Sequence, residues 1–407
     1  MLRSGEHSVA ITGLGVIAPH GDDPGAMFDA LMEGRSGLRR WEGATDPVVA
    51  GTVQFDPARW FTKLQMLGLD RVSQLAVAAA EMARADAKVQ DLDPLRVGVF
   101  VGCGMGGAIS IETAFRSHAT TGRVPPLSIP AGMGNAPAAH IAMRGGFKGP
   151  VLSYCVACSS SAVAIAEAGK SIRAGEIDVA FAGGTEAMLV PAIVRAWQML
   201  QTLATPDPER IETSCRPFAL DRSGFVLSEG AAFLVLESAA SAQRRGARIY
   251  ADLVGSGLSC DATHLTKPDA AGQARAMKGA LASAGLQPAD VGYCNAHGTA
   301  TPAGDVVECD ALGSVWGDDL GALRVSSTKS MHGHLLGGAG ALEAMITVLA
   351  LHRGQIPPTA FCSRPDPKCA VPLVREQGEA APQLRAAISN SFAFGGTNAV
   401  LAFQRHH

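Results

Sequence analysis

The sequence predicts an α/β protein made of two similar halves that share one hydrophobic core. Short apolar runs typical of strands alternate with longer helical runs along the first part of the chain. The same alternation starts again near residue 245, and no Pro/Ser-rich or charged linker separates the two parts. We therefore expect one half over residues 1–244 and another over residues 245–407, packed together rather than folded as independent domains.

The elements of the first half follow from its apolar runs. Strands are expected at residues 9–11, 97–101, 152–156, 179–182 and 232–236, with helices at 26–32 and 162–174. Gly175 can end the second of these helices.

The second half repeats this pattern. Strands are expected at residues 250–254, 291–295, 386–390 and 398–403, with helices at 273–284 and 340–351. Many of the 47 glycines fall at strand ends, where the backbone must turn or approach another segment closely.

The composition indicates a largely buried chain. Hydrophobic residues make up 47% and charged residues only 17%, against a usual charged fraction of about 25%, so we also expect subunit contacts. With 34 Lys and Arg against 37 Asp and Glu, the net charge of -3 provides no global field for nucleic acid.

A cytoplasmic location is expected. The nine cysteines are odd in number and widely spaced, which favours a reducing compartment. The first residues lack the pattern of a secretory signal, and prolines break the long uncharged runs, so neither secretion nor a membrane span is expected.

Three Gly-rich segments superficially suggest phosphate binding. Gly13-Leu14-Gly15 and residues 102–107 each follow a strand, but the first is broken by Pro19 and the second lacks the acidic residue about 20 positions later. Turn formation is the favoured interpretation for the first and tight packing for the second. Gly169-Lys170-Ser171 lies within a predicted helix and is discarded.

Two short motifs could suggest redox or metal chemistry. In the CxxC segment, Cys155 lies in a predicted strand rather than beside Cys158 at a helix start, so a redox pair is disfavoured. His332 and His334 lack a suitably spaced third ligand, and the neighbouring Lys329 would repel a cation. We expect no metal.

Cys158 is the first candidate for chemistry, because an apolar strand runs through it into a helix. The unpaired N–H groups and positive dipole at a helix N-terminus favour thiolate over thiol. This segment alone fits an inert buried cysteine better. Two further turns change the balance, since residues 295–301 and 326–334 each place a His beside Gly after a strand, where α/β folds gather catalytic groups.

These segments together resemble the elongating β-ketoacyl-[acyl-carrier-protein] synthases, of the KAS II type in the thiolase superfamily. The matching blocks are Ala157-Cys158-Ser159-Ser160, Asn295-Ala296-His297-Gly298-Thr299, Ser327-Thr328-Lys329-Ser330-Met331, Gly333-His334 and Phe394-Gly395-Gly396-Thr397-Asn398. Further blocks extend the match, in order, over nearly the whole chain. The resemblance implies a thiolase-type fold with two duplicated halves in five α/β/α/β/α layers.

The resemblance also implies roles for the matching residues. Cys158 would take the acyl chain, and His297 and His334 would promote decarboxylation of a malonyl thioester and stabilise its enolate. The backbone N–H groups of Cys158 and Phe394 would form the oxyanion hole, with Phe394 also gating the acyl pocket.

The remaining matched residues would support this chemistry. Lys329 would hold the local electrostatics, with Glu343 as its counter-charge, since an unpaired buried ammonium is costly. Thr299 and Thr301 would bind the phosphopantetheine arm. Asp305 and Glu308 are expected to fix the turn after His297 by structural hydrogen bonds. These supporting residues are Thr299, Thr301, Asp305, Glu308, Lys329 and Glu343.

Some positions depart from the housekeeping pattern. His332 replaces the usual Thr and Ala393 the usual Gly, as in nodulation-type synthases, while Ser159-Ser160-Ser161 is closer to polyketide synthases. Residues 64–69 are uncharged where carrier-docking basic residues are common, which leaves the docking surface open.

The resemblance thus predicts decarboxylative Claisen condensation of acyl-Cys with malonyl-[acyl-carrier-protein], in fatty-acid or polyketide synthesis. The expected partners are an acyl carrier protein and a second copy of the chain, without metal or organic cofactor, nucleic acid or membrane. Two alternatives stay open: the ketosynthase of a heterodimer with a chain-length factor, and a non-catalytic carrier-binding subunit. The retained Cys158 argues against a chain-length factor itself.

Overall fold

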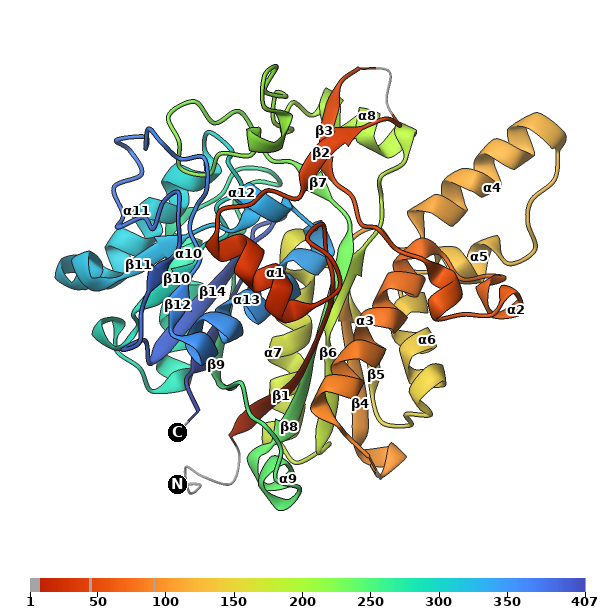
Figure 1. Ribbon diagram of the computed structural model, residues 1–407, viewed down its shortest axis with the longest axis horizontal. Helices are drawn as coiled ribbons and strands as arrows, with labels where there is room; N and C mark the ends of the chain where they lie inside the picture. The colour runs from red at the N-terminus through yellow and green to blue at the C-terminus, as the bar shows by residue number, and fades with distance from the viewer. Residues whose placement is uncertain (1–7, 44–45, 91, 407) are drawn as a thin grey trace.

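The computed structural model describes residues 8–43, 46–90 and 92–406, and its main feature is one ten-stranded mixed sheet (Figure 1). Five strands come from each half of the chain. Those of the first half are β1 (Val9–Ile17), β4 (Val97–Gly102), β5 (Val151–Tyr154), β6 (Val179–Glu186) and β8 (Gly230–Ser238). Those of the second half are β9 (Ala251–Cys260), β10 (Tyr293–Asn295), β11 (Arg324–Ser326), β14 (Ala386–Phe392) and β15 (Thr397–Gln404).

The two halves have the same topology. The strand order is β5-β4-β6-β8-β1 in the first half and β11-β10-β14-β15-β9 in the second. If the five strands of each half are numbered along the chain, both halves have the same spatial order, 3-2-4-5-1. In each half the three strands farthest from the junction run parallel and the remaining pairings are antiparallel. The predicted duplication is therefore confirmed, whereas the boundary at residues 244 and 245 stays a prediction.

Antiparallel pairing of β1 with β9 joins the two halves. Val9 lies opposite Leu253 and Ile11 opposite Ala251. The first strand of each half thus has a partner strand on both sides, and the two halves form one continuous hydrogen-bonded sheet.

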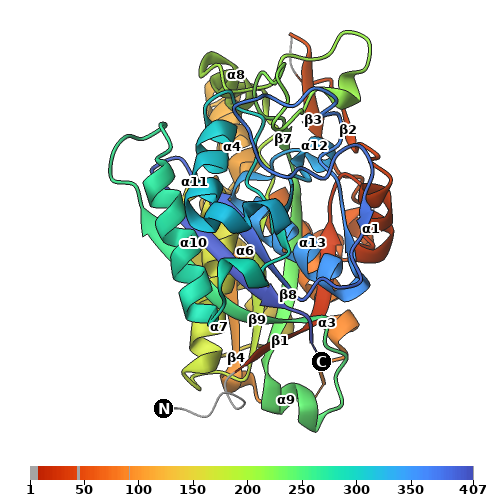
Figure 2. The same cartoon turned by 90° about the vertical axis from the view of Figure 1, so that its left-hand side faces the viewer.

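Helices complete the five predicted layers. Between the halves of the sheet lie α7 (Ser160–Arg173) and α13 (Ala339–Arg353), each of which contacts strands of both halves. The outer face of the first half is covered by α3 (Arg71–Ala87) and α6 (Ala136–Gly145). On the other side α10 (Ala270–Ala284) covers β9 and β15, with α11 (Gly304–Trp316) beside it (Figure 2).

Small residues let α7 and α13 pack closely in the central layer. A Cβ atom on Gly340 would lie 2.9 Å from the Cβ of Ala162, so this contact requires glycine. Ser161 of α7 accepts a hydrogen bond from the backbone N–H of Ala341 at 2.9 Å. Residues 339–351 of α13 are all buried, as expected for a helix covered on every side.

The structure corrects the predicted turn at Gly13 and Gly15. Strand β1 continues to Ile17, and both glycines lie inside it beneath α3. A Cβ on Gly13 would lie 2.3 Å from the carbonyl oxygen of Ala83, and one on Gly15 2.0 Å from that of Ala79. Close helix packing, which is a long-range property, explains these glycines.

The remaining elements lie around this frame. They are α1 (Pro24–Met32), β2 (Leu38–Trp41), β3 (Val48–Gly51), α2 (Lys63–Met66), α4 (Ala108–Thr121), α5 (Ser128–Gly132), α8 (Pro191–Met199), β7 (Leu227–Ser228), α9 (Ala239–Arg244), α12 (Lys329–His332), β12 (Gln355–Ile356) and β13 (Glu379–Ala380). Within the described ranges, none of the helices has the length and apolar character needed to cross a membrane.

Candidate active site

Cys158 lies in a sharp turn between β5 and α7. A 3₁₀ turn over Ala157–Ser159 leads directly into the helix, so the predicted helix-terminal position is confirmed. Ala157 has a φ of 48°, a left-handed conformation that is unfavourable for a residue with a Cβ. The Ser160 hydroxyl holds this turn, because it accepts from the N–H of Val156 at 2.9 Å and donates to the carbonyl of Ala157 at 2.6 Å.

Two histidines face Cys158 from the second half of the chain. The Cys158 sulfur and one ring nitrogen each of His297 and His334 all lie within 4.8 Å of one another. The imidazole rings are 5.4 Å apart between centroids and nearly perpendicular. His297 follows β10, and His334 follows α12. The duplicated fold therefore brings three distant segments to one point.

Backbone hydrogen bonds fix both histidines. Glu308 of α11 accepts from the N–H of His297 at 2.8 Å and from that of Gly298 at 2.7 Å. The N–H of His334 donates to the carbonyl of Val226 at 2.7 Å. Both ring nitrogens of His334 are buried without a hydrogen-bond partner, so this side chain can bind an incoming group.

Lys329 lies behind His297 and forms a buried ion pair with Glu343 of α13. Its ammonium is 3.5 Å from Nδ1 of His297. Because an ammonium can only donate, this contact makes Nδ1 the acceptor and leaves the ring proton on Nε2. His297 is thereby oriented as a hydrogen-bond donor through Nε2.

Burial changes the protonation expected at the site. It raises the pKa of the Cys158 thiol to about 12, although the Lys329 charge and the Phe394 N–H act in the opposite direction. Desolvation therefore works against the thiolate that the helix terminus favours. Burial and the Lys329 charge lower the pKa of both His297 and His334 well below the usual value. The two imidazoles are therefore neutral at physiological pH.

A cavity of about 330 Å³ leads to these groups. Predicted site residues that line it are Cys158, His297, Thr299, Thr301, Asp305, Glu308, His334 and Phe394, while Lys329 and Glu343 lie outside the lining. The hydroxyls of Thr299 and Thr301 are 3.1 Å apart. The structure thus brings all ten predicted site residues to one cavity or its immediate support.

Asp305 and Arg222 shape the turn that carries the two threonines. Asp305 accepts from the N–H of Phe218 at 2.7 Å, and burial raises its pKa to about 7. The Arg222 guanidinium donates to the carbonyls of Thr301 at 3.1 Å and Pro302 at 2.7 Å. Arg222 lies in no recognisable sequence motif, so only the structure shows that it holds the backbone after Thr301 in place.

Sequence reasoning also missed an aromatic wall and a buried carboxylate. Trp197 and Phe225 line the cavity; Phe225 lies 5.5 Å from His334, and Trp197 lies 6.3 Å from Phe394 between ring centroids. Glu186 accepts from the N–H groups of Gly104, Met105 and Gly337, so it ties residues 102–107 to the turn after His334. Isolated aromatic and acidic residues carry no local pattern that would have identified them.

The two departures from the housekeeping pattern occupy different surroundings. His332 is buried outside the cavity lining, with Nδ1 2.7 Å from the carbonyl of Gly333 and Nε2 2.9 Å from the Thr328 hydroxyl. Ala393 lines the cavity and lies outside the left-handed region, whereas Gly395 and Gly396 have φ values of 89° and 74°.

A thiolase-type fold that places one thiol beside two imidazoles defines a condensing enzyme of the ketosynthase class. The N-terminal domain of beta-ketoacyl synthases matches residues 6–242 and the C-terminal domain matches residues 250–363. The chain belongs to the β-ketoacyl synthase family.

Several named proteins are similar to this chain over nearly its whole length. Nodulation protein E of Rhizobium meliloti (strain 1021) is 40% identical over 412 residues, covering 98% of this chain and all of that protein. The 3-oxoacyl-[acyl-carrier-protein] synthase 2 of Staphylococcus aureus (strain N315) is 38% identical over 408 residues, covering 98% of each. Among solved structures, the ishigamide ketosynthase/chain length factor superposes with a TM-score of 0.92 at 34% identity, covering 99% of this chain and all of that chain.

Proposed function

We propose that the protein condenses a Cys158-bound acyl group with malonyl-[acyl-carrier-protein], releasing CO₂ and forming β-ketoacyl-[acyl-carrier-protein]. The observation that carries this proposal is a largely apolar cavity in which a thiol meets two neutral imidazoles. Such a site can hold an acyl thioester away from water and can donate hydrogen bonds to an enolate.

In the first half-reaction, the sulfur of Cys158 attacks the carbonyl of an acyl-carrier thioester. The new bond joins that sulfur to the acyl carbon, the carrier sulfur leaves, and the thiol proton goes to the departing carrier thiol. The N–H groups of Cys158 and Phe394 are the proposed donors to the tetrahedral oxyanion.

In the second half-reaction, the carboxylate of the malonyl thioester leaves as CO₂ and its bonding electrons form an enolate. Neutral His297 and His334 donate hydrogen bonds to the enolate oxygen without a permanent charge that would trap it. The enolate carbon then attacks the acyl-Cys carbonyl, and the sulfur of Cys158 leaves as a thiolate that takes up one proton from solvent. Lys329, paired with Glu343, keeps the Nε2 proton of His297 directed into the cavity.

The carrier protein is the proposed source of both substrates. Thr299 and Thr301 line the same cavity and are the proposed hydroxyl donors for the phosphopantetheine arm. The steps above use only residues of this chain and need no organic cofactor or metal. We place the enzyme in the cytoplasm, since all nine cysteines are free thiols, as in a reducing compartment.

Two mass measurements test this proposal. Incubation with an acyl-[acyl-carrier-protein] should add one acyl mass to the intact protein, and malonyl-[acyl-carrier-protein] should then remove it and yield the β-ketoacyl product. An unchanged mass in a folded protein would instead support the non-catalytic carrier-binding subunit. Formation of the acyl-enzyme without condensation would contradict the second half-reaction alone.

We further propose that the chain works as a dimer formed across β5 and the arm around α4. Strand β5 is the outermost strand of the first half, with Val151 and Leu152 38% and 45% exposed. At the opposite edge of the sheet, the backbone of Val325 in β11 forms hydrogen bonds with Pro372 and Val374, so the loop that contains these two residues covers this edge. An apolar strand edge without a partner is a site where a second chain adds.

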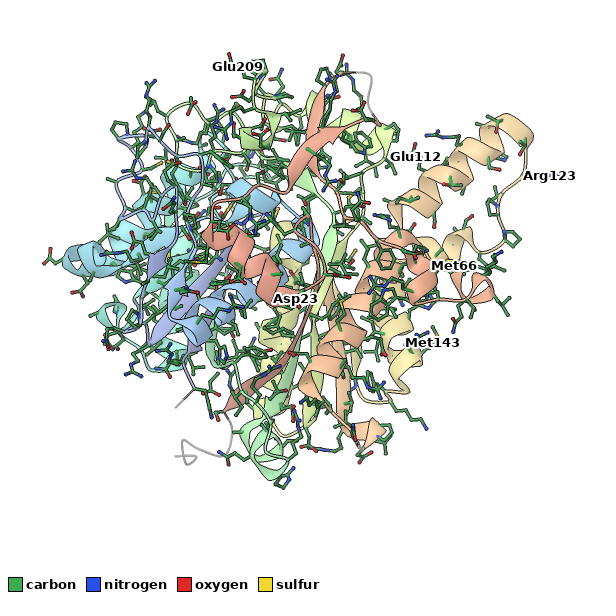
Figure 3. All side chains as sticks on the ribbon, in the orientation of Figure 1. Asp23, Met66, Glu112, Arg123, Met143 and Glu209 are labelled. Carbon is green, nitrogen blue, oxygen red and sulfur yellow. The ribbon has the colours of Figure 1, made fainter. Side chains whose placement is uncertain are left out.

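The α4 arm supports the same interface. The structure describes every residue of α4, and Ala108 alone is buried, while Phe115 is 73% exposed. Figure 3 shows Glu112 and Arg123 on this arm, which projects from the body of the molecule. A helix of 14 residues is marginal in water by itself, so its exposed apolar side chains need a covering partner.

A single charged substitution in β5 tests the proposed dimer interface. Leu152→Lys should give a monomer by light scattering, because a pairing strand edge would bury the charge, whereas Leu95→Lys, on an exposed 3₁₀ turn, should leave the dimer intact. A dimer that survives Leu152→Lys would rule out this interface. Co-purification with an unequal homologous subunit would replace the homodimer by a ketosynthase/chain-length-factor pair.

Ala393 is expected to influence acyl-chain length. Its N–H donates to the carbonyl of Thr397 at 3.0 Å, and the N–H of Gly396 donates back to Ala393 at 3.0 Å, so the loop bearing Phe394 is closed by a tight turn. Ala393→Gly frees that backbone, an effect of about 0.4–1 kcal/mol or roughly 2- to 5-fold in loop population. We expect Ala393→Gly to shift the acyl-length preference of Cys158 acylation by that factor while malonyl decarboxylation stays nearly constant. An unchanged length profile would exclude Ala393 as a selectivity determinant.

A further inference from the structure

Cys158, His297 and His334 also have the side chains and the spacing of a ligand set for a transition-metal ion. Their three ligand atoms lie within 4.8 Å of one another. Thiolate and imidazole are the ligands that divalent zinc prefers, and the ligand atoms of tetrahedral zinc lie roughly 3.3–3.8 Å apart. Side-chain movements of about 1 Å would therefore bring all three atoms to bonding distance.

His334 provides an independent observation that a ligand can bind here. Its side chain is 1% exposed, and neither ring nitrogen has a hydrogen-bond partner. A buried imidazole without partners is costly, and a metal bond would satisfy one of its nitrogens. The cavity lies over the same three side chains, so a fourth ligand position would face open space and the ion has an entry path.

The contrast with His332 shows why this triad, and not the His332/His334 pair, is the metal-binding candidate. Both nitrogens of His332 are already engaged, by the Gly333 carbonyl and the Thr328 hydroxyl. The sequence motif His-x-His therefore supplies only one free imidazole. The second one comes from His297, which the fold brings in from a distant segment.

Lys329 limits how tightly a cation can bind. Its ammonium is 3.5 Å from Nδ1 of His297, which places a positive charge next to one ligand. Glu343 offsets this charge through the buried ion pair, and a metal-bound Cys158 thiolate adds one negative charge. The charges around the site therefore allow a cation to bind but do not hold it tightly, which predicts reversible binding.

We propose that the catalytic triad is an inhibitory site for thiophilic divalent cations of the zinc class, which compete with the acyl group for the sulfur of Cys158. The metal displaces the thiol proton and bonds to Nε2 of His297, whose ring proton moves to Nδ1. Lys329 then gives up one proton so that its amine can accept from Nδ1–H. One sulfur–metal bond forms and two protons are released, with no change of oxidation state. An acylated Cys158 has no thiolate to offer, and the acyl-enzyme is therefore resistant. Only the competition with acylation rests on the function proposed above, because the binding itself depends on geometry alone.

Cobalt(II) is the probe for binding, because its bonds to thiolate and its tetrahedral coordination are visible by absorption spectroscopy. Titration of the full-length protein with cobalt(II) chloride should give one equivalent of a thiolate-to-cobalt charge-transfer band, which zinc chloride should abolish. Cys158→Ala, His297→Ala and His334→Ala should each lose at least tenfold in cobalt affinity. The matched control Cys155→Ala removes an exposed thiol near the site and should bind normally.

A second experiment tests competition with the substrate. Zinc chloride should slow self-acylation in proportion to its concentration, EDTA should restore it, and pre-acylated enzyme should give no cobalt band. A band that persists in Cys158→Ala, or that disappears in Cys155→Ala, would overturn the site. Cobalt binding at the triad with unchanged acylation rates would overturn the inhibitory role. Absence of self-acylation without metal, together with a normal cobalt band, would count against the proposed function and leave the metal site standing.

Discussion

Cys158→Ala is expected to abolish condensation, with a loss of at least about 10⁴-fold, while the protein keeps its fold. The alanine fits in the space of a small side chain, and the turn around residue 158 is held by Ser160 rather than by the thiol. Condensation should be measured with an acyl and a malonyl carrier substrate. Circular dichroism should show an unchanged fold.

The matched control for this variant is Cys155→Ala. Cys155 is exposed and lies three residues before Cys158, yet its thiol donates to the carbonyl of Gly104 and lies outside the cavity lining. We expect this variant to condense normally, and peptide mapping should find the acyl group on Cys158 alone among the nine cysteines. An acyl group on Cys155 or Cys103 would refute the assignment of the nucleophile.

His297→Ala and His334→Ala are each expected to slow malonyl decarboxylation by about 10²- to 10³-fold, as when one hydrogen-bond donor to a developing oxyanion is removed. Self-acylation of Cys158 should stay measurable in both variants, because the helix terminus and the backbone N–H groups remain. The measurements are CO₂ release from a malonyl thioester and acyl-enzyme formation by intact mass.

His332→Thr is the control for the two alanine variants, because it changes a nearby histidine that does not face the cavity. His332→Thr changes a buried imidazole that lies outside the cavity lining, so it should slow decarboxylation far less than His297→Ala or His334→Ala does. If both alanine variants stay folded but lose acylation as well, the thiol would depend on a histidine base, as in cysteine proteases. That result would exclude direct transfer of the thiol proton to the leaving carrier thiol.

Local sequence signals predicted the site because its residues follow strand ends and helix starts. The strand and helix on either side of Cys158 and the glycine beside each histidine are neighbours along the chain, so short patterns detect them. The lysine and its counter-charge could be paired only through the resemblance, since Lys329 and Glu343 come from different helices.

Features that depend on distant packing could not be predicted in this way. The strand containing Gly13 and Gly15 continues because α3 presses on it, and no local pattern reports that contact. The pKa of Cys158 depends on how deeply the folded chain buries its thiol, and this desolvation works against the thiolate that the helix terminus favours. Phe225 and Arg222 likewise gain their places only from the assembled fold.

The shared central layer has a consequence for synthesis on the ribosome. Helix α7 lies between both halves of the sheet, and α13, which covers it, begins only at Ala339. The first half therefore leaves the ribosome with an apolar inner face that nothing in the nascent chain can yet cover. Such a surface is prone to aggregation. Translation speed and chaperone supply during the second half should accordingly determine how much soluble enzyme a cell obtains.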